Sequence, residues 1–295
     1  MNKEITIIRY LSVSSMFKNC TIIFNTKNKT IPVNSIIIKE VDIISLDSPL
    51  LLTKSLTTML SSPSSATTEK KVLIIASNAV DMADADKHDA RNNLWEVAPP
   101  YHVFFSHGYQ VDFVSPNGGS VPFMMDPLGI SSYTIKYEGF MDKANHSLTP
   151  EQVNVADYWA VYIGGGYGPM FDVANNKAIQ NIIASIYESG GIVGSGGHGA
   201  AAYANVLLSS GEYLVKGKKV AGFPDSTEKS KSWAKQGSLL PFLVESQLNK
   251  HGAFAQNKQI LKDKHQVIID QRIVSTMFLP SAALVAKEMI MLKQQ

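Results

Sequence analysis

The chain of 295 residues is 45% hydrophobic and 18% charged, with a formal net charge of +2, a composition typical of a globular protein with a sizeable core. It contains neither a run of about five or six like charges nor an apolar stretch of roughly 18 residues, so nucleic acid binding and membrane insertion are not indicated. Its single cysteine, Cys20, excludes an intramolecular disulfide and a cysteine-based zinc site.

The first part of the chain differs from the rest. Residues 5–45 are rich in Ile, Asn, Lys and Thr, and "SSPSSATTEKK" at 61–71 has the composition of a linker. We therefore predict that residues 1–68 form a poorly ordered extension or a small appendage, and that residues 69–295 form one α/β domain. We expect a cytoplasmic protein without metal or cofactor, and a targeting role for the extension stays open.

From residue 70 onward, short apolar runs alternate with stretches of helical periodicity. Strands are expected at "KKVLIIAS" (70–77), "QVDFVSP" (110–116), "YWAVYIGGG" (158–166), "GIVGSGG" (191–197), "GKKVAGFP" (217–224) and "IVSTM" (273–277). Helices are expected at 94–108, 178–191, 238–252 and 281–294. This alternation predicts a three-layer α/β sandwich, in which a mostly parallel central sheet carries helices on both faces.

Three glycine-rich turns follow predicted strands, at 164–168, 194–199 and 222–228. Because ligands bind at the carboxyl ends of the strands in such sheets, we expect a site formed by these turns. The turn at Gly197 resembles the strand-to-helix elbow on which many α/β enzymes carry a nucleophile. The first turn matches no common nucleotide-binding motif, and its backbone amides could instead form an oxyanion hole.

Three side chains are candidates for this site. His198 follows the elbow directly, and its alternative role is a local hydrogen bond. Glu228 could orient the imidazole, or it could be an acid at a helix start. Glu96 could stabilise the N-terminus of the first helix, or it could be a buried carboxyl with a raised pKa that transfers protons. His102 and His107 do not share a helix face, so we do not expect them to bind metal.

Residues 70–295 resemble the ThiJ/PfpI family of the class I glutamine amidotransferase-like superfamily, which has a flavodoxin-like fold. The similarity lies nearest its branch of glutathione-independent glyoxalases, protein deglycases and holding chaperones. The stretches that carry it are "LWEVAPPYHVFFSHGYQVDFVSPNGG", "YWAVYIGGGYGPMFD", "GGIVGSGGHGAAAYANV", "YLVKGKKVAGFPDSTE" and "LPSAALVAKEMI".

The resemblance implies a role for each matched residue. It places the nucleophilic cysteine of the family at Gly197, next to His198, and matches Glu96 to the acid that hydrogen-bonds the thiol. It matches Glu228 to the acid that orients the histidine. It also assigns backbone positions of the pocket, at Gly165, Gly166 and Gly199, and implies a homodimer that acts on reactive carbonyl compounds such as methylglyoxal.

The glycine at position 197 departs from the family pattern, since the reaction of the family proceeds through a hemithioacetal on a cysteine. Ser195 lies within a predicted strand and Cys20 in the extension, so neither is expected to substitute. Glycine does adopt the strained elbow conformation freely, which costs other residues about 1–3 kcal/mol. The late Asn-Pro turn of the family is also altered, to Leu279-Pro280.

We therefore expect a catalytically impaired or non-catalytic protein that binds a small carbonyl compound or a related ligand. One alternative is an active lyase or hydrolase that uses Glu96 and His198 without a thiol. Another is a stress-related holding chaperone, for which "VPFMM" at 121–125 would supply exposed apolar side chains.

Overall fold

The computed structural model describes residues 71–124, 129, 131–233, 235–257 and 267–295. All of them belong to the unit Ala66–Gln295 of the chain. The predicted extension of residues 1–68 lies outside the described residues, as does Cys20, so the predicted division at residue 68 stays a prediction.

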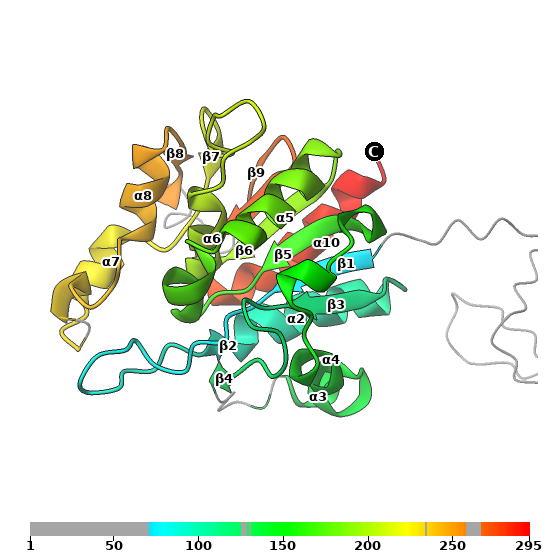
Figure 1. Cartoon of the computed structure of the whole chain (residues 1–295), viewed down its shortest axis with the longest axis horizontal. Helices are drawn as coiled ribbons and strands as arrows, with labels where there is room; N and C mark the ends of the chain where they lie inside the picture. Colours follow the sequence, from blue (N-terminus) through cyan, green and yellow to red (C-terminus); the bar gives the residue numbers. More distant parts are fainter. Residues whose placement is uncertain (1–70, 125–128, 130, 234, 258–266) are drawn as a thin grey trace, which may run out of the picture. The chain divides into compact units, whose positions relative to one another are not determined.

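A six-stranded sheet forms the middle layer (Figure 1). Five strands are parallel to their neighbours and the last pairs antiparallel. Their order across the sheet is β3 (Val111–Val114), β1 (Lys71–Ile75), β5 (Tyr158–Ile163), β6 (Ile192–Gly196), β10 (Ile273–Thr276) and β9 (Ile268–Asp270). The predicted, mostly parallel sheet is confirmed.

Helices cover both faces of this sheet. Alternate residues of β1 point to opposite sides, because side chains alternate along a strand. Val72 and Ile74 pack in one core with α2 (Leu94–Ser106) and α10 (Ala282–Lys293). Leu73 and Ile75 pack in the other core, which contains residues of α5 (Lys177–Glu188), α6 (Ala201–Ala204) and α8 (Val244–Lys250). The predicted three-layer sandwich is thereby confirmed, and Figure 1 shows α5 and α10 on either side of the strands.

Two predicted elements are shorter than expected. The helix expected at 238–252 begins only at Val244, since Pro241 disfavours helical conformation in the residue before it. The strand expected at 217–224 is only β7 (Lys219–Val220), which pairs with β8 (Phe254–Ala255) outside the central sheet. The strand stops there because the next two backbone amides donate to side chains: that of Ala221 to Ser275 and that of Gly222 to Asn257.

Several short elements were not predicted. They are β2 (Asn92–Asn93), β4 (Phe123–Met124), β8, β9, α3 (Ser132–Tyr137), α4 (Phe140–Asn145) and α7 (Asp225–Ser230), with the helical turns η1 (Pro150–Gln152), η2 (Val155–Asp157), η3 (Pro169–Val173), η4 (Gly197–Ala200), η5 (Lys235–Gly237) and η6 (Leu279–Ser281). Most lie in the connections between strands. Among them, η4 and α7 carry residues of the candidate site.

The stretch "VPFMM" is not the exposed apolar surface that the sequence suggested. Val121 is buried in the core beside α2, and Phe123 and Met124 are half-buried. Met125 lies outside the described residues. In the described ranges, no helix has both the length and the apolarity of a membrane span.

Candidate active site

The elbow lies at the carboxyl edge of the sheet, as predicted. Strand β6 ends at Gly196, and η4 and α6 follow without a break. Gly197 has a φ of +48°, in the left-handed region that glycine tolerates best. A Cβ at Gly199 would lie 2.4 Å from the carbonyl oxygen of Ile163, so a glycine allows this turn to pack against the end of β5.

Glu96 lies in the first turn of α2, and its side chain adjoins the elbow. The side chain of Asn93 caps this helix by accepting a hydrogen bond from the amide of Trp95. The Glu96 side chain is buried, and this burial raises the pKa of its carboxyl to about 8, against a hydrogen bond from the Gly166 amide and the charge of Lys231. The carboxyl is therefore mostly protonated at neutral pH.

The Glu96 carboxyl lies between two glycines. A Cβ on Gly197 would be 2.3 Å from Oε1, and a Cβ on Gly165 would be 2.2 Å from Oε2. Oε1 is buried and has no hydrogen-bond partner among the described residues. The carboxyl thus occupies the space that a side chain at position 197 would need.

His198 and Glu228 form a buried pair. Nε2 of His198 lies 2.7 Å from Oε1 of Glu228, which stands in the first turn of α7. Burial, together with the charge of Lys231, lowers the pKa of His198 against the hydrogen bond and charge of Glu228, so the imidazole is mostly neutral at neutral pH. With Nε2 donating its proton to the carboxylate, Nδ1 carries a lone pair.

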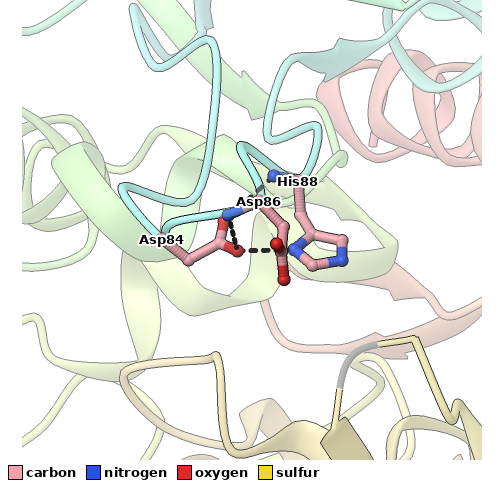
Figure 2. A group of neighbouring side chains, drawn as sticks. All are labelled: Asp84, Asp86 and His88. Carbon is pink, nitrogen blue, oxygen red and sulfur yellow. Dashed lines mark hydrogen bonds and ion pairs between the residues drawn. The ribbon is translucent and has the colours of Figure 1, made fainter.

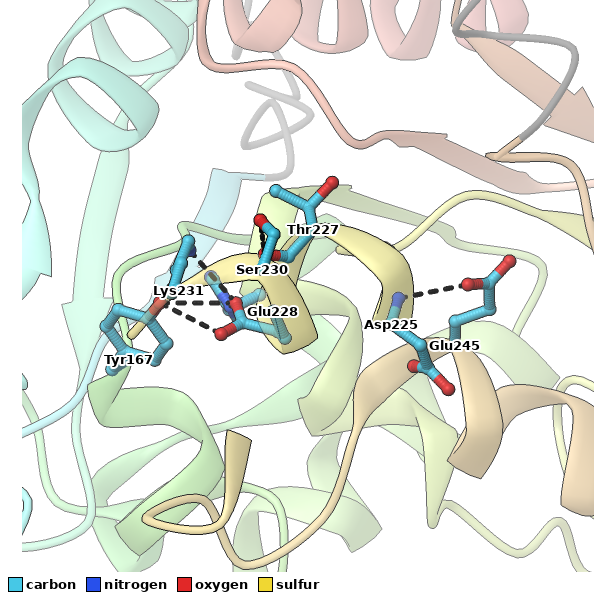
Figure 3. A network of polar contacts seen from close by, with 8 residues as sticks. Tyr167, Asp225, Thr227, Glu228, Ser230, Lys231 and Glu245 are labelled. Carbon is cyan, nitrogen blue, oxygen red and sulfur yellow. Dashed lines mark hydrogen bonds and ion pairs between the residues drawn. The ribbon is translucent and has the colours of Figure 1, made fainter. Parts of the chain in front are cut away.

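The carboxylate of Glu228 has two further partners, which sequence reasoning missed. The hydroxyl of Tyr167 lies 3.2 and 3.1 Å from its two oxygens, and Nζ of Lys231 lies 3.2 Å from Oε1 (Figure 3). Burial raises the pKa of Glu228, but its bond and charge interaction with His198 and the charge of Lys231 outweigh this and lower it. Glu228 is therefore ionised at neutral pH.

Aromatic rings hold the imidazole from two sides. The ring of Phe223 stacks on His198 with centroids 4.1 Å apart and an interplanar angle of 15°. The ring of Tyr167 lies 4.3 Å away at 41°. Trp233 packs edge-on against Tyr167, with ring centroids 5.5 Å apart. These contacts fix the orientation of the imidazole, as the bond to Glu228 does.

Other nucleophiles and ligand groups lie apart from the elbow. Ser195 is buried and its hydroxyl donates to the hydroxyl of Tyr203, 3.0 Å away, so it does not substitute at the elbow. Nδ1 of His102 bonds Glu138 at 2.6 Å, and Nδ1 of His107 bonds the carbonyl of Val103 at 2.7 Å. His102 is therefore paired with an acid outside its own helix, and His107 with a carbonyl of α2 itself.

The ligand atoms of Asp84, Asp86 and His88 lie within 4.8 Å of one another, so these residues could hold a metal ion (Figure 2). The sequence analysis did not single out this group. The Asp84 carboxylate accepts hydrogen bonds from the backbone amides of Asp86 and His88, and its Oδ2 lies 2.7 Å from Nδ1 of His88. These bonds within the loop stabilise its conformation.

Comparison with known proteins extends this description. The sequence profile of the DJ-1/PfpI family matches residues 90–278, which include Glu96, the elbow and Glu228. The chain belongs to the DJ-1/PfpI family. The ThiJ/PfpI resemblance read from the sequence is thereby confirmed.

Two curated DJ-1/PfpI relatives are named as glyoxalases. The chain is 29% identical over 170 residues to "Glutathione-independent glyoxalase HSP31" of Saccharomyces cerevisiae, a match that covers 54% of this chain and 70% of the relative. It is also 29% identical over 212 residues to "Glyoxalase 3" of Candida albicans, covering 66% and 86%.

Solved structures agree with this membership. The glyoxalase III of Candida albicans has a TM-score of 0.64 and 25% identity, over 76% of this chain and 97% of that one. The Rapid Encystment Protein of Francisella tularensis has a TM-score of 0.67 and 26% identity, over 76% and 98%. Both cover most of the DJ-1/PfpI fold described here.

Proposed function

We propose that this chain binds a small carbonyl compound at the elbow and does not perform the thiol-dependent reaction that the family resemblance implies. One observation carries the proposal: Gly197 offers no nucleophilic atom, and the Glu96 carboxyl fills the space beside it. A nucleophile missing from a comparable catalytic unit lowers turnover by about a million-fold. The relatives named as glyoxalases indicate the class of ligand.

The polar groups at the elbow suit a carbonyl ligand. A protonated Glu96 can donate a hydrogen bond to the carbonyl oxygen from Oε1, which has no partner among the described residues, and Nδ1 of neutral His198 can accept one from a hydroxyl of the hydrated carbonyl. The amide of Gly166 already bonds the Glu96 carboxyl. The oxyanion role expected for the amides of Gly165 and Gly199 stays a prediction.

The experiment incubates purified protein with methylglyoxal and follows both lactate and ligand binding, the latter by ligand-observed NMR. We expect saturable binding that His198→Ala weakens, and no lactate above the uncatalysed level. Lactate formation at ordinary enzyme rates, about 1 per second or faster, would contradict the proposal. Failure to bind any carbonyl probe would contradict it equally.

A matched pair of variants tests whether a thiol at position 197 is enough to produce catalysis. Gly197→Cys adds a thiol, and Gly197→Ala adds the same Cβ without sulfur. We expect lactate from the cysteine variant alone, once the Glu96 carboxyl has shifted away from the new Cβ, because His198 and Glu228 already hold the arrangement that serves a thiol. Equal, background lactate from both would show that the remaining residues are not arranged for that chemistry.

A second function is favoured by the protonation states of Glu96 and His198. A neutral base can take the proton from the hydrated aldehyde carbon of methylglyoxal while a protonated acid protonates the neighbouring carbonyl oxygen; return of a proton to that second carbon then gives lactate, with the hydrate supplying the added water. In that case the unchanged chain would form lactate slowly, and both Glu96→Gln and His198→Ala would abolish it.

A further inference from the structure

Lys231 is a charged group of the site that neither the sequence analysis nor the family comparison assigns. It follows α7 directly, and its Nζ lies 2.7 Å from the hydroxyl of Tyr167 and 3.2 Å from Oε1 of Glu228 (Figure 3). The same Glu228 oxygen bonds His198 at 2.7 Å. One carboxylate oxygen therefore holds Lys231 and the imidazole close together.

The ammonium retains hydrogen-bonding capacity. A lysine ammonium has three N–H donors, and the structure engages it with two partners, Tyr167 and Glu228. The side chain is 23% exposed, so a ligand can reach it. The ring centroids of Phe223, Tyr167 and Trp233 lie 4.1, 5.2 and 5.9 Å from Nζ. These rings reduce the access of water to the charge, which strengthens its interaction with an anion.

The charge of Lys231 acts across the whole site. It lowers the pKa of both Glu96 and His198, the two side chains on either side of the elbow. Glu228 is ionised, but its charge is balanced by Lys231, while Glu96 is protonated and His198 neutral. No unbalanced negative charge among these four groups would repel an anion.

We propose that the ligand of this site is a 2-oxo carboxylate, whose carboxylate binds Lys231 while its carbonyl lies beside Glu96 and His198. The inference rests on the proposed carbonyl-binding function and narrows it to an anionic substrate class. With such a ligand both partners of the hydrogen bond to Lys231 are ionised, whereas an uncharged 2-oxoaldehyde offers the ammonium only a neutral acceptor.

The experiment compares pyruvate with methyl pyruvate, which has the same skeleton without the negative charge. Affinities are measured by ligand-observed NMR or calorimetry with the full chain. We expect pyruvate to bind about ten- to hundredfold more tightly, which is the range for a hydrogen bond to a charged group. The preference should decrease as salt is added.

Variants at two lysines of the same segment test the residue itself. Lys231→Met should lower the affinity for pyruvate by more than the affinity for methyl pyruvate, so that the preference is lost, while Lys231→Arg should keep a preference. Lys229→Met is the matched control, because Lys229 is exposed and two positions away. It should behave as the unchanged chain.

Three outcomes would overturn the inference. If pyruvate and methyl pyruvate bind equally tightly and His198→Ala weakens both, the proposal of an anionic ligand is rejected. The carbonyl-binding proposal then still stands. An equal loss of both ligands in Lys231→Met would make Lys231 a positioning residue for Glu228. Failure of both ligands to bind the unchanged chain would reject the carbonyl-binding proposal as well.

Discussion

Gly197→Ala should destabilise the fold, and most of the cost should depend on Glu96. Alanine in the left-handed conformation at φ +48° costs about 1–2 kcal/mol, and the stiffer unfolded chain offsets about 0.4–1 kcal/mol of this. The new Cβ would also lie 2.3 Å from Oε1 of Glu96, an overpacked contact that costs about 1–3 kcal/mol. We expect a total loss of about 3 kcal/mol.

A double-mutant cycle separates the two contributions. Urea unfolding is measured for the unchanged chain, Gly197→Ala, Glu96→Ala and the double variant, at pH 6, where Glu96 is protonated. In the Glu96→Ala background the contact is absent, so Gly197→Ala should cost only about 1 kcal/mol. The coupling free energy between the two positions should therefore be about 2 kcal/mol.

The result that refutes this reasoning is additivity. If Gly197→Ala costs the same in both backgrounds, the Glu96 carboxyl does not occupy the space beside Gly197. The contact between Glu96 and the space beside Gly197, one of the two observations behind the proposed function, would then have no energetic support. A change in the denaturant slope would show instead that the variant alters the compactness of the unfolded state.

Two further predictions concern the charged groups of the site. The pKa of Glu96 is raised from 4.5 to about 8, so the free energy of unfolding should fall as pH rises from 4.5 to 8, by at most about 5 kcal/mol at roughly 1.4 kcal/mol per unit. Glu96→Gln should lack this decline, which denaturant unfolding of both proteins at pH 5 and pH 8 would measure. Equal declines in the two proteins would show that the pH dependence does not come from Glu96. Tyr167→Phe removes the hydroxyl that joins Glu228 to Lys231 and should cost about 1–3 kcal/mol in urea unfolding. A loss within the error of the measurement would mean that the buried carboxylate does not depend on Tyr167.

The parts of the site that lie on regular elements could be predicted from the sequence. The continuous apolar runs of β1, β5 and β6 identify buried parallel strands, and glycine-rich turns after β5 and β6 locate the edge where ligands bind. Asn93 and the helical spacing after it place Glu96 in the first turn of α2. Sequence patterns alone therefore locate Glu96 and the elbow.

The missed residues are those whose roles depend on tertiary contacts. Tyr167 stands in a turn whose glycines indicate only a role for backbone amides, and its hydroxyl bonds Glu228, which α7 carries from 61 positions further along the chain. Lys231 has the sequence signature of a solvated lysine in a polar stretch. The sequence indicates its contact with Glu228 only weakly: Lys231 follows Glu228 by three positions, the spacing at which side chains of one helix meet.

The Glu96 carboxyl lies between Gly165 and Gly197, so the residues that can be accepted at positions 96, 165 and 197 depend on one another. A side chain gained at either glycine meets the same carboxyl, so its acceptance by selection depends on what residue 96 already is. Among descendants of this sequence, a substitution at 165 or 197 should be accepted together with a shifted Glu96 carboxyl or a shorter residue at 96. Variation at the three positions is thereby coupled through one buried side chain.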